Sequence, residues 1–169
     1  MNSEELRKRQ GPIKQLYREN AAAALVTLKA IARLGREITC KIESGKPGAD
    51  AGLHPAAGGD GSHACSGDML LEALAACAGV TLKAVATSMA IDLKKGSVIA
   101  EGDIDFRGTL GVSRDVPVGF RQIRLSFELD TSASEDQLAT LIRLTERYCV
   151  VFQTLKSSPE IILSSKRIV

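Results

Sequence analysis

Residues Met69 to Ile91 read MLLEALAACAGVTLKAVATSMAI, a long apolar stretch in which alanine predominates. Glu72 and Lys83 leave only ten uninterrupted residues between them, about half of the roughly 20 that a membrane-spanning helix needs. A spanning helix would also carry more Leu, Ile and Phe. A helix that is apolar almost all round must be covered on every side. The stretch therefore predicts a helix buried inside a globular protein, not one that crosses a membrane.

The composition fits one globular domain and excludes several classes of partner. The chain has 169 residues, 44% of them hydrophobic, which is enough to bury a core. A net charge of +2 without a basic, aromatic-rich stripe gives no reason to expect nucleic acid or a membrane surface. The first ten residues, MNSEELRKRQ, lack the apolar region of a secretory signal. With four cysteines, this predicts reduced thiols and a cytoplasmic location.

The segment before the apolar stretch predicts a helix and then a β-hairpin. Residues 3–20 are charge-rich and helical in character, with an interruption at Gly11-Pro12, where Pro12 can begin a second short helix. Apolar residues then alternate with polar ones over 24–34 and again over 38–42, with a turn at Gly35-Arg36. We therefore predict an N-terminal helical extension over 1–22 and one domain over 23–169.

Between the hairpin and the apolar helix, residues 45–67 are rich in glycine and show almost no periodicity. Such a long loop inside a compact domain is usually functional or mobile. Ser66 is the expected N-cap of the helix, and Asp68 places a negative charge in its first turn, where the helix dipole favours it.

The remaining sequence predicts two long strands, a helix and a last strand. Apolar and polar residues alternate over 98–107 and 123–129, and a change of parity before the second run predicts a β-bulge near Arg121-Gln122. Ser132-Ala-Ser-Glu135 fits a capping box at the start of a helix, and Ile161 to Ser164 fits a short strand. This order of elements predicts an α+β fold with an antiparallel sheet.

Two of the four cysteines are candidates for chemistry. Cys77 lies among small residues, Ala75, Ala76, Ala78 and Gly79, which let other elements approach its sulfur closely. Cys149 follows the second helix; if a new helix begins there, its free N–H groups favour a thiolate. For both, a structural role stays open, because a free cysteine behaves as a small hydrophobe.

The other two cysteines predict no chemistry. Cys40 falls on the inward parity of its strand, as a core residue would. Cys65 precedes Cys77 by twelve residues, about 18 Å along one helix and far beyond disulfide reach. Cys65 could in principle bind zinc with the loop residues His54, His63 and Asp60, but their spacing matches no standard zinc pattern. We therefore expect no metal.

An alanine-rich central helix carries a cysteine in LLEALAAC, a capped helix ends in a second cysteine about seventy residues later, and a short terminal strand follows. This order of elements resembles that of the OsmC-like (organic hydroperoxide resistance) family. The resemblance covers roughly Ala24 to the C-terminus. It implies the OsmC-like fold, an antiparallel sheet with two central helices in an intertwined homodimer. It also implies a cysteine-based enzyme that reduces organic or inorganic hydroperoxides without a cofactor.

The resemblance assigns roles to residues. Cys77 matches the cysteine that attacks the peroxide, and Cys149 the one that resolves the sulfenic acid as a disulfide. A dithiol, such as a lipoyl group, would reduce that disulfide. Arg36 is the nearest match to the family arginine, with Arg33 as the alternative. The place of the family glutamate is Gly67 here, so the adjacent Asp68 is the candidate carboxylate.

A second function stays open. Loss of the family glutamate and the low polarity of the central helix also fit a non-catalytic OsmC-like module that binds an apolar small molecule at the dimer interface. The proline usual after the second cysteine is Val150 here, another departure from the family's pattern.

Overall fold

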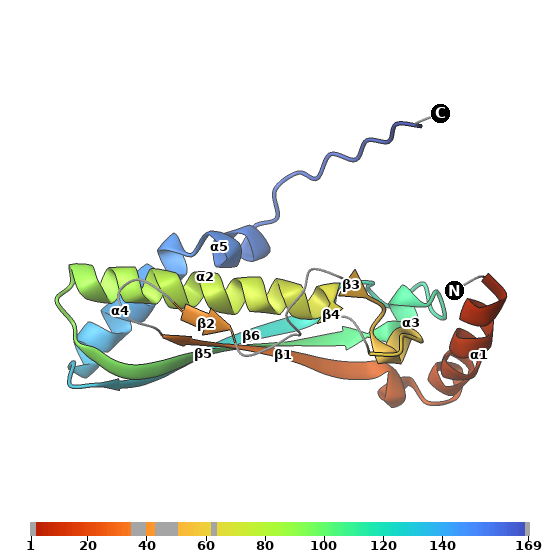
Figure 1. Ribbon diagram of the computed structural model, residues 1–169, viewed down its shortest axis with the longest axis horizontal. Helices are drawn as coiled ribbons and strands as arrows, with labels where there is room; N and C mark the ends of the chain where they lie inside the picture. The colour runs from red at the N-terminus through yellow and green to blue at the C-terminus, as the bar shows by residue number, and fades with distance from the viewer. Residues whose placement is uncertain (1–2, 35–39, 43–50, 62–63, 168–169) are drawn as a thin grey trace.

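The computed structural model describes residues 3–34, 40–42, 51–61 and 64–167. It is α+β, as the sequence predicts, with a sheet on one side and helices along one of its faces (Figure 1). In chain order the elements are α1 (Ser3–Glu19), η1 (Ala21–Ala24), β1 (Leu25–Leu34), β2 (Cys40–Ile42), β3 (Ala51–Gly52), η2 (Pro55–Ala57), β4 (Ala64–Cys65), α2 (Ser66–Ser88), β5 (Leu93–Asp105), α3 (Phe106–Thr109), β6 (Phe120–Thr131), α4 (Glu135–Tyr148) and α5 (Val150–Lys156).

The main sheet has the strand order β2-β1-β5-β6, and every neighbouring pair is antiparallel. The residues of β5 that the sequence predicts to face one side, such as Val98 and Ala100, are fully buried. The predicted bulge is confirmed: Asp103 pairs with Gln122 and Ile104 with Phe120, which leaves Arg121 as the extra residue. Phe106 continues the inward row as a buried residue but begins the short helix α3 instead of extending the strand.

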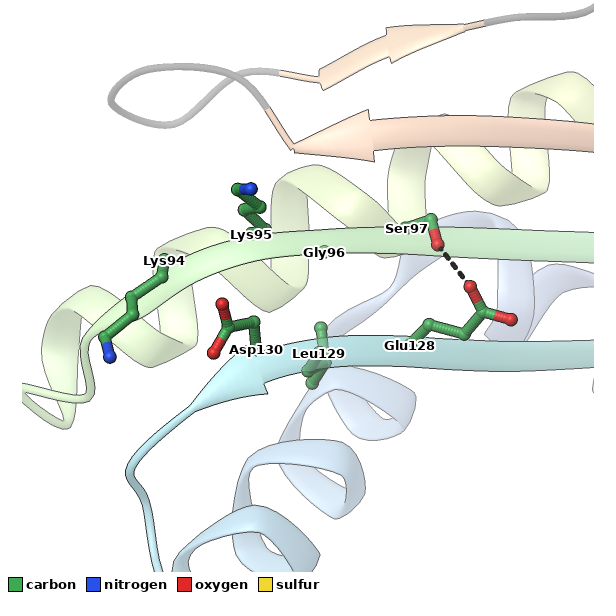
Figure 2. A pocket seen from close by; sticks show the side chains of 7 residues that line it. All are labelled: Lys94, Lys95, Gly96, Ser97, Glu128, Leu129 and Asp130. Atoms are coloured by element: carbon green, nitrogen blue, oxygen red, sulfur yellow. Dashed lines mark hydrogen bonds between the residues drawn. The ribbon is translucent and has the colours of Figure 1, made fainter.

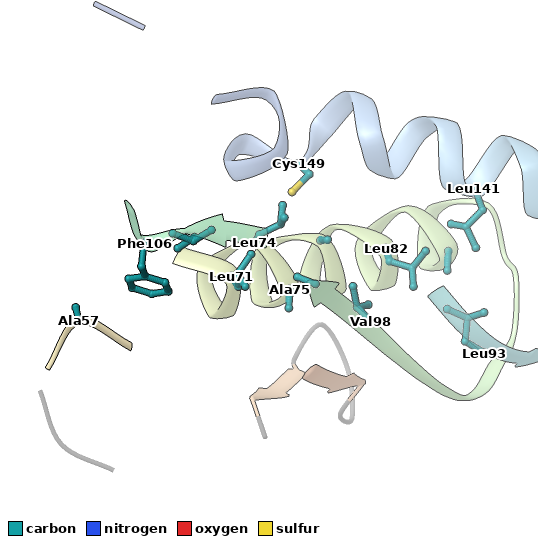
Figure 3. Packing of buried hydrophobic residues seen from close by; sticks show 14 of the residues in the cluster. Ala57, Leu71, Leu74, Ala75, Leu82, Leu93, Val98, Phe106, Leu141 and Cys149 are labelled. Carbon is teal, nitrogen blue, oxygen red and sulfur yellow. The ribbon is translucent and has the colours of Figure 1, made fainter. Parts of the chain in front are cut away.

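Helix α2 lies along the inner face of the sheet and supplies a large part of the core (Figures 1 and 3). It is long and apolar enough to span a membrane by length and composition, but Leu71, Leu74 and Leu82 are fully buried inside the protein. Burying one such side chain contributes about 1.5–3 kcal/mol. The apolar character of α2 is therefore explained by its place between the sheet and helices α4 and α5.

Two predicted helix starts are off by a few residues. The N-cap of α2 is Cys65 instead of Ser66, and it makes no side-chain cap hydrogen bond. The capping box of α4 is formed by Ser134 and Gln137 instead of Ser132 and Glu135, because each side chain of that pair bonds the other residue's backbone N–H. The glycine-rich loop also contains short elements, β3, η2 and β4, that its composition does not indicate.

The N-terminal helix is continuous, contrary to the predicted break at Gly11-Pro12. Two side chains fix it to η2: Gln10 donates a hydrogen bond to the carbonyl of Ala57 at 3.1 Å, and the Tyr17 hydroxyl donates to Ala56 at 2.8 Å. These anchors lie on either side of Pro12, so tertiary contacts offset the hydrogen bond that proline cannot make. Tyr17 is only 4% exposed and belongs to the core.

The predicted last strand is wrong for this single chain. Residues 157–167 form no strand or helix and extend away from the body of the protein (Figure 1). Ile161, Ile162 and Leu163 are 82%, 84% and 90% exposed. Three large apolar side chains in a row are therefore left in contact with solvent.

Candidate functional site

Cys77 lies in the middle of α2, where the neighbouring side chains are small. Its neighbours Ala75, Ala78 and Gly79 are buried and small, and they let α4 and α5 approach the helix closely. Cys77 itself is half-buried. Cys77 thus lies at the boundary between the core and the outer face of α2.

Cys149 lies at the break between α4 and α5, as the sequence suggested. Its extended backbone (φ −74°, ψ 107°) ends α4, with its N–H donating to the carbonyl of Thr145 at 2.9 Å. It is also the N-cap of α5: its sulfur accepts a hydrogen bond from the backbone N–H of Phe152 at 3.5 Å. The side chain is completely buried and its sulfur points toward α2 (Figure 3).

The fold brings these two cysteines together although seventy-one other residues separate them in the chain. Both are free thiols, and the Cys149 side chain forms a hydrogen bond with Cys77. The pKa of Cys149 is raised from 9.0 to about 11, first by burial and then by this hydrogen bond and the charge of Cys77; backbone N–H groups of Phe152 and Val151 oppose the shift. Burial therefore outweighs the helix N-terminus that was expected to favour a thiolate there.

The raised pKa bears on the protonation state of Cys149. A thiol with a pKa of about 11 is protonated at neutral pH, and only a thiolate is an effective nucleophile. Cys149 must therefore lose this proton before it can react as a nucleophile.

The surroundings of the pair are apolar. A cavity of about 160 Å³ reaches Cys149 and is lined by side chains from α2, β6, α4 and α5, namely Ala78, Leu125, Phe127, Ile142, Thr145, Glu146 and Phe152. Its larger neighbour, about 310 Å³, shares Leu125 and Phe152 with it. The smaller cavity reaches Cys149, and the larger one lies beside it between β6 and α5.

The structure does not test Arg36, and it places Asp68 away from the thiols. Arg36 lies outside the described residues, and of Arg33 the structure describes only the backbone in β1. Asp68 is in the first turn of α2, nine residues before Cys77, which is about 13 Å along the helix axis and on its opposite side. The roles of Arg36 and Asp68 stay predictions.

Asp68 belongs to a different cluster, at the N-terminal end of α2. Its nearest charged partner is His54, whose ring stacks on Phe106 with 4.9 Å between centroids. Burial raises the pKa of Asp68 and His54 opposes the shift; burial lowers the pKa of His54 and Asp68 opposes it. His54 also accepts a hydrogen bond from the backbone N–H of Ala56 on its Nδ1 atom at 3.0 Å. Sequence reasoning placed His54 in a loop and had no signal for this pairing.

Two further features lie apart from the thiols. A cavity of about 520 Å³ lies where β5 begins and β6 ends; Ser97 donates a hydrogen bond to Glu128 there at 3.0 Å, and Lys94, Lys95 and Asp130 also line it (Figure 2). It holds no thiol and is balanced in charge, so it is not the candidate site. On α2, the Oε1 atom of Glu72 is buried with no hydrogen-bond partner among the described residues. The charge of Glu72 within an apolar helix is the signal that could have singled it out.

Fold and site together define a small α+β protein with a pair of interacting thiols in its core. Residues 59–164, more than half of the chain, match the sequence profile of the OsmC-like proteins, so the protein belongs to the OsmC-like family. No curated protein sequence matches it.

Two solved structures share the fold. An OsmC-like hydroperoxide resistance protein from Jannaschia sp. CCS1 superposes with a TM-score of 0.59 at 16% identity, covering 82% of this chain and 91% of that one. An OsmC-like protein from Mycoplasma pneumoniae gives a TM-score of 0.53 at 20% identity, covering 79% and 86%. At these identities the similarity concerns the fold.

Proposed function

We propose that this protein is a thiol-dependent peroxidase that reduces hydroperoxides through Cys77 and Cys149. The observation that carries the proposal is the interaction between a half-buried thiol, Cys77, and a fully buried one, Cys149, whose pKa is raised by burial. Two free cysteines in contact need no large movement to form a disulfide. Membership of a family that includes a protein named for hydroperoxide resistance supports the same activity.

The reaction follows from the two environments. The Cys77 thiolate attacks the outer oxygen of ROOH, the O–O bond breaks, and the alkoxide takes a proton to leave as ROH; Cys77 is now a sulfenic acid. Cys149 then loses its proton and attacks the Cys77 sulfur; the S–S bond forms, the S–O bond of the sulfenic acid breaks, and the hydroxide takes up the proton and leaves as water. An external dithiol, of the lipoyl type or an added thiol, reduces the disulfide by exchange and is itself oxidised.

Cys149 has a part in the first step as well. Its side chain interacts with Cys77, and we propose that its S–H group donates to the Cys77 thiolate, because a hydrogen bond to a charged acceptor stabilises the charged form. In an apolar site this donor offsets part of the desolvation of a thiolate. An arginine from the β1–β2 hairpin, Arg36 or Arg33, would add to this stabilisation.

We propose further that the active form is a homodimer. The outer face of α2 leaves Leu70 37% and Val80 38% exposed on either side of Cys77 along the helix, and the C-terminal segment exposes three large apolar residues. A second copy that covers both surfaces would remove this apolar area from water. It would also enclose Cys77.

Single-turnover peroxide consumption, with a sulfenic-acid trap, tests the activity. The wild-type protein should consume one equivalent of an organic hydroperoxide, whereas Cys77→Ser should consume none. Cys65→Ser is the matched control, because Cys65 is also a half-buried thiol on the chain but lies at the far end of α2. If Cys77→Ser consumes peroxide as fast as wild type, Cys77 is only a core residue.

A second candidate is a non-catalytic module that binds an apolar small molecule. The apolar cavities beside Cys149 favour it, because a largely apolar pocket with few polar groups is typical of small-molecule sites. This second function is supported if wild-type protein consumes no organic hydroperoxide with any dithiol.

A further inference from the structure

Helices α4 and α5 are joined by a single residue, Cys149 (Figure 3). Helix α5 has only seven residues, and so short a helix depends on contacts with the rest of the protein. The sulfur of Cys149 caps it through the N–H of Phe152, but at 3.5 Å and with sulfur as the acceptor this bond is weak. Because the same sulfur must also react with Cys77, the α4–α5 corner (residues 146–153) needs a stabilising contact that does not involve this sulfur.

Gln153 makes such a contact from α5. Its side-chain amide donates a hydrogen bond to the backbone carbonyl of Glu146 at 2.8 Å. That carbonyl lies in the last turn of α4, where carbonyl groups have no N–H partner within the helix. The backbone N–H of Gln153 also donates to the carbonyl of Cys149 at 2.9 Å. Gln153 is therefore bonded both to the residue at the corner and to the helix before it.

Lys156 adds a second and weaker link between the same helices. Its ammonium group lies 2.7 Å from a carboxylate oxygen of Glu146, and the two side chains are 58% and 42% exposed. Exposed ion pairs contribute little to stability. The hydrogen bond from Gln153 is partly buried, so it is the stronger of the two links.

We propose that Gln153 is a positioning residue for the second step of the reaction: its side chain fixes the α4–α5 corner so that the Cys149 sulfur stays directed at Cys77. The inference rests on the proposed function and adds a residue that controls how fast the sulfenic acid is resolved. Cys149 must approach the Cys77 sulfur opposite the departing oxygen, and a small rotation of the corner would misalign the two sulfurs. Reactions between fixed groups are sensitive to such changes in orientation.

Rapid mixing with one equivalent of an organic hydroperoxide tests this role, because peroxide consumption reports the first step and loss of trappable sulfenic acid reports the second. Gln153→Met keeps the length of the side chain and removes the donor, so it should slow the second step about fivefold and leave the first unchanged. Gln153→Lys restores a donor toward the same carbonyl, at a helix end where a cation is favourable, and should recover the rate to within about twofold. Thr154→Val, at an exposed neighbour on α5, is the control and should match wild type.

A purely structural role predicts a different pattern. Gln153→Met would then lower the free energy of unfolding without changing the ratio of the two rates, and that result would overturn the inference. A Gln153→Lys variant as slow as Gln153→Met would overturn it as well, because the donor would not be what matters.

A second assay separates this inference from the proposed function. In a Cys40→Ser/Cys65→Ser background, a coloured aromatic disulfide (dithiobis-nitrobenzoate) forms a mixed disulfide with the Cys77 thiolate and releases one aromatic thiolate. Cys149 then loses its proton to the buffer, attacks the Cys77 sulfur and releases the second aromatic thiolate. Gln153→Met should slow this second release about fivefold even if the protein reduces no hydroperoxide. Equal second release in both proteins, or none in either, would overturn the role of Gln153.

Discussion

The middle of helix α2 and its N-terminus have opposite chemistry. Around its middle, Cys77 and Cys149 lie among apolar side chains, and their polar contacts in the described structure are each other and the backbone of α5. At its N-terminus, His54 and Asp68 share an environment closed by α1 and α3. Asp68 and Cys77 are thus about 13 Å apart along one helix. The comparison teaches that the His54–Asp68 pair does not reach the thiols, so that among the described residues the two thiols interact mainly with each other.

The largest expected effect comes from substitutions of Cys149, which remove one thiol of the pair. Cys149→Ser should consume one equivalent of hydroperoxide and then stop, with a sulfenic acid trapped at Cys77, because no resolving thiol remains. Cys149→Ala should be slower in that first step than Cys149→Ser, because the hydroxyl keeps a donor toward Cys77 and the methyl group does not. Rapid-mixing peroxide consumption measures both rates. Equal rates for the two variants would show that Cys149 does not assist the attack.

The second effect tests whether a second copy of the chain covers the exposed apolar side chains. Light scattering at micromolar concentration should give twice the 18.0 kDa of one chain. An Ile161→Asp/Ile162→Asp variant should weaken the dimer, since it places charge where apolar side chains require cover. Ser164→Asp/Ser165→Asp is the control in the same segment. A wild-type mass of 18.0 kDa would contradict the dimer.

The third effect measures the burial of Cys149 in solution. Because its pKa rises from 9.0 to about 11 on folding, the folded protein keeps a proton that the unfolded chain loses above pH 9. The free energy of unfolding should therefore fall between pH 9 and pH 11, by at most about 2.7 kcal/mol, and the contribution is fully present below pH 9. Urea denaturation of wild type and Cys149→Ala across this range isolates the difference. Parallel curves would mean that Cys149 is not buried as a neutral thiol.

The smallest effect concerns the other end of the helix. Asp68→Asn should change the rate of peroxide consumption by less than about twofold, because Asp68 is about 13 Å from Cys77 on the opposite side of α2. It should instead shift the His54 titration to lower pH, since Asp68 raises the pKa of His54. NMR of the imidazole follows that shift. A tenfold loss of peroxidase rate would restore Asp68 to the site.

The sequence predicted what depends on local periodicity. Alternation located β1, β5 and β6, and the change of parity located the bulge at Arg121. The sequence did less well where tertiary contacts decide. The helix runs through Pro12 because Gln10 and Tyr17 anchor it, and Ile161 to Ser164 lacks a neighbouring strand within its own chain.

The candidate site shows the same division. Cys77 and Cys149 were singled out as residues, but only the resemblance to a family paired them, since no local pattern joins positions so far apart. Their unequal burial and the hydrogen bond between them come from the packing of α4 and α5 on α2. His54 and Asp68 meet because a glycine-rich loop folds back on the helix, which its aperiodic sequence does not indicate.

The most direct test of the central claim is the disulfide that the thiol pair should form. The reduced protein would be treated with one equivalent of an organic hydroperoxide, alkylated, digested without reductant and mapped by mass spectrometry. We predict a Cys77–Cys149 link in most of the protein, with Cys40 and Cys65 alkylated as free thiols. A link between Cys65 and Cys77, or all four cysteines free after the peroxide is consumed, would contradict the account.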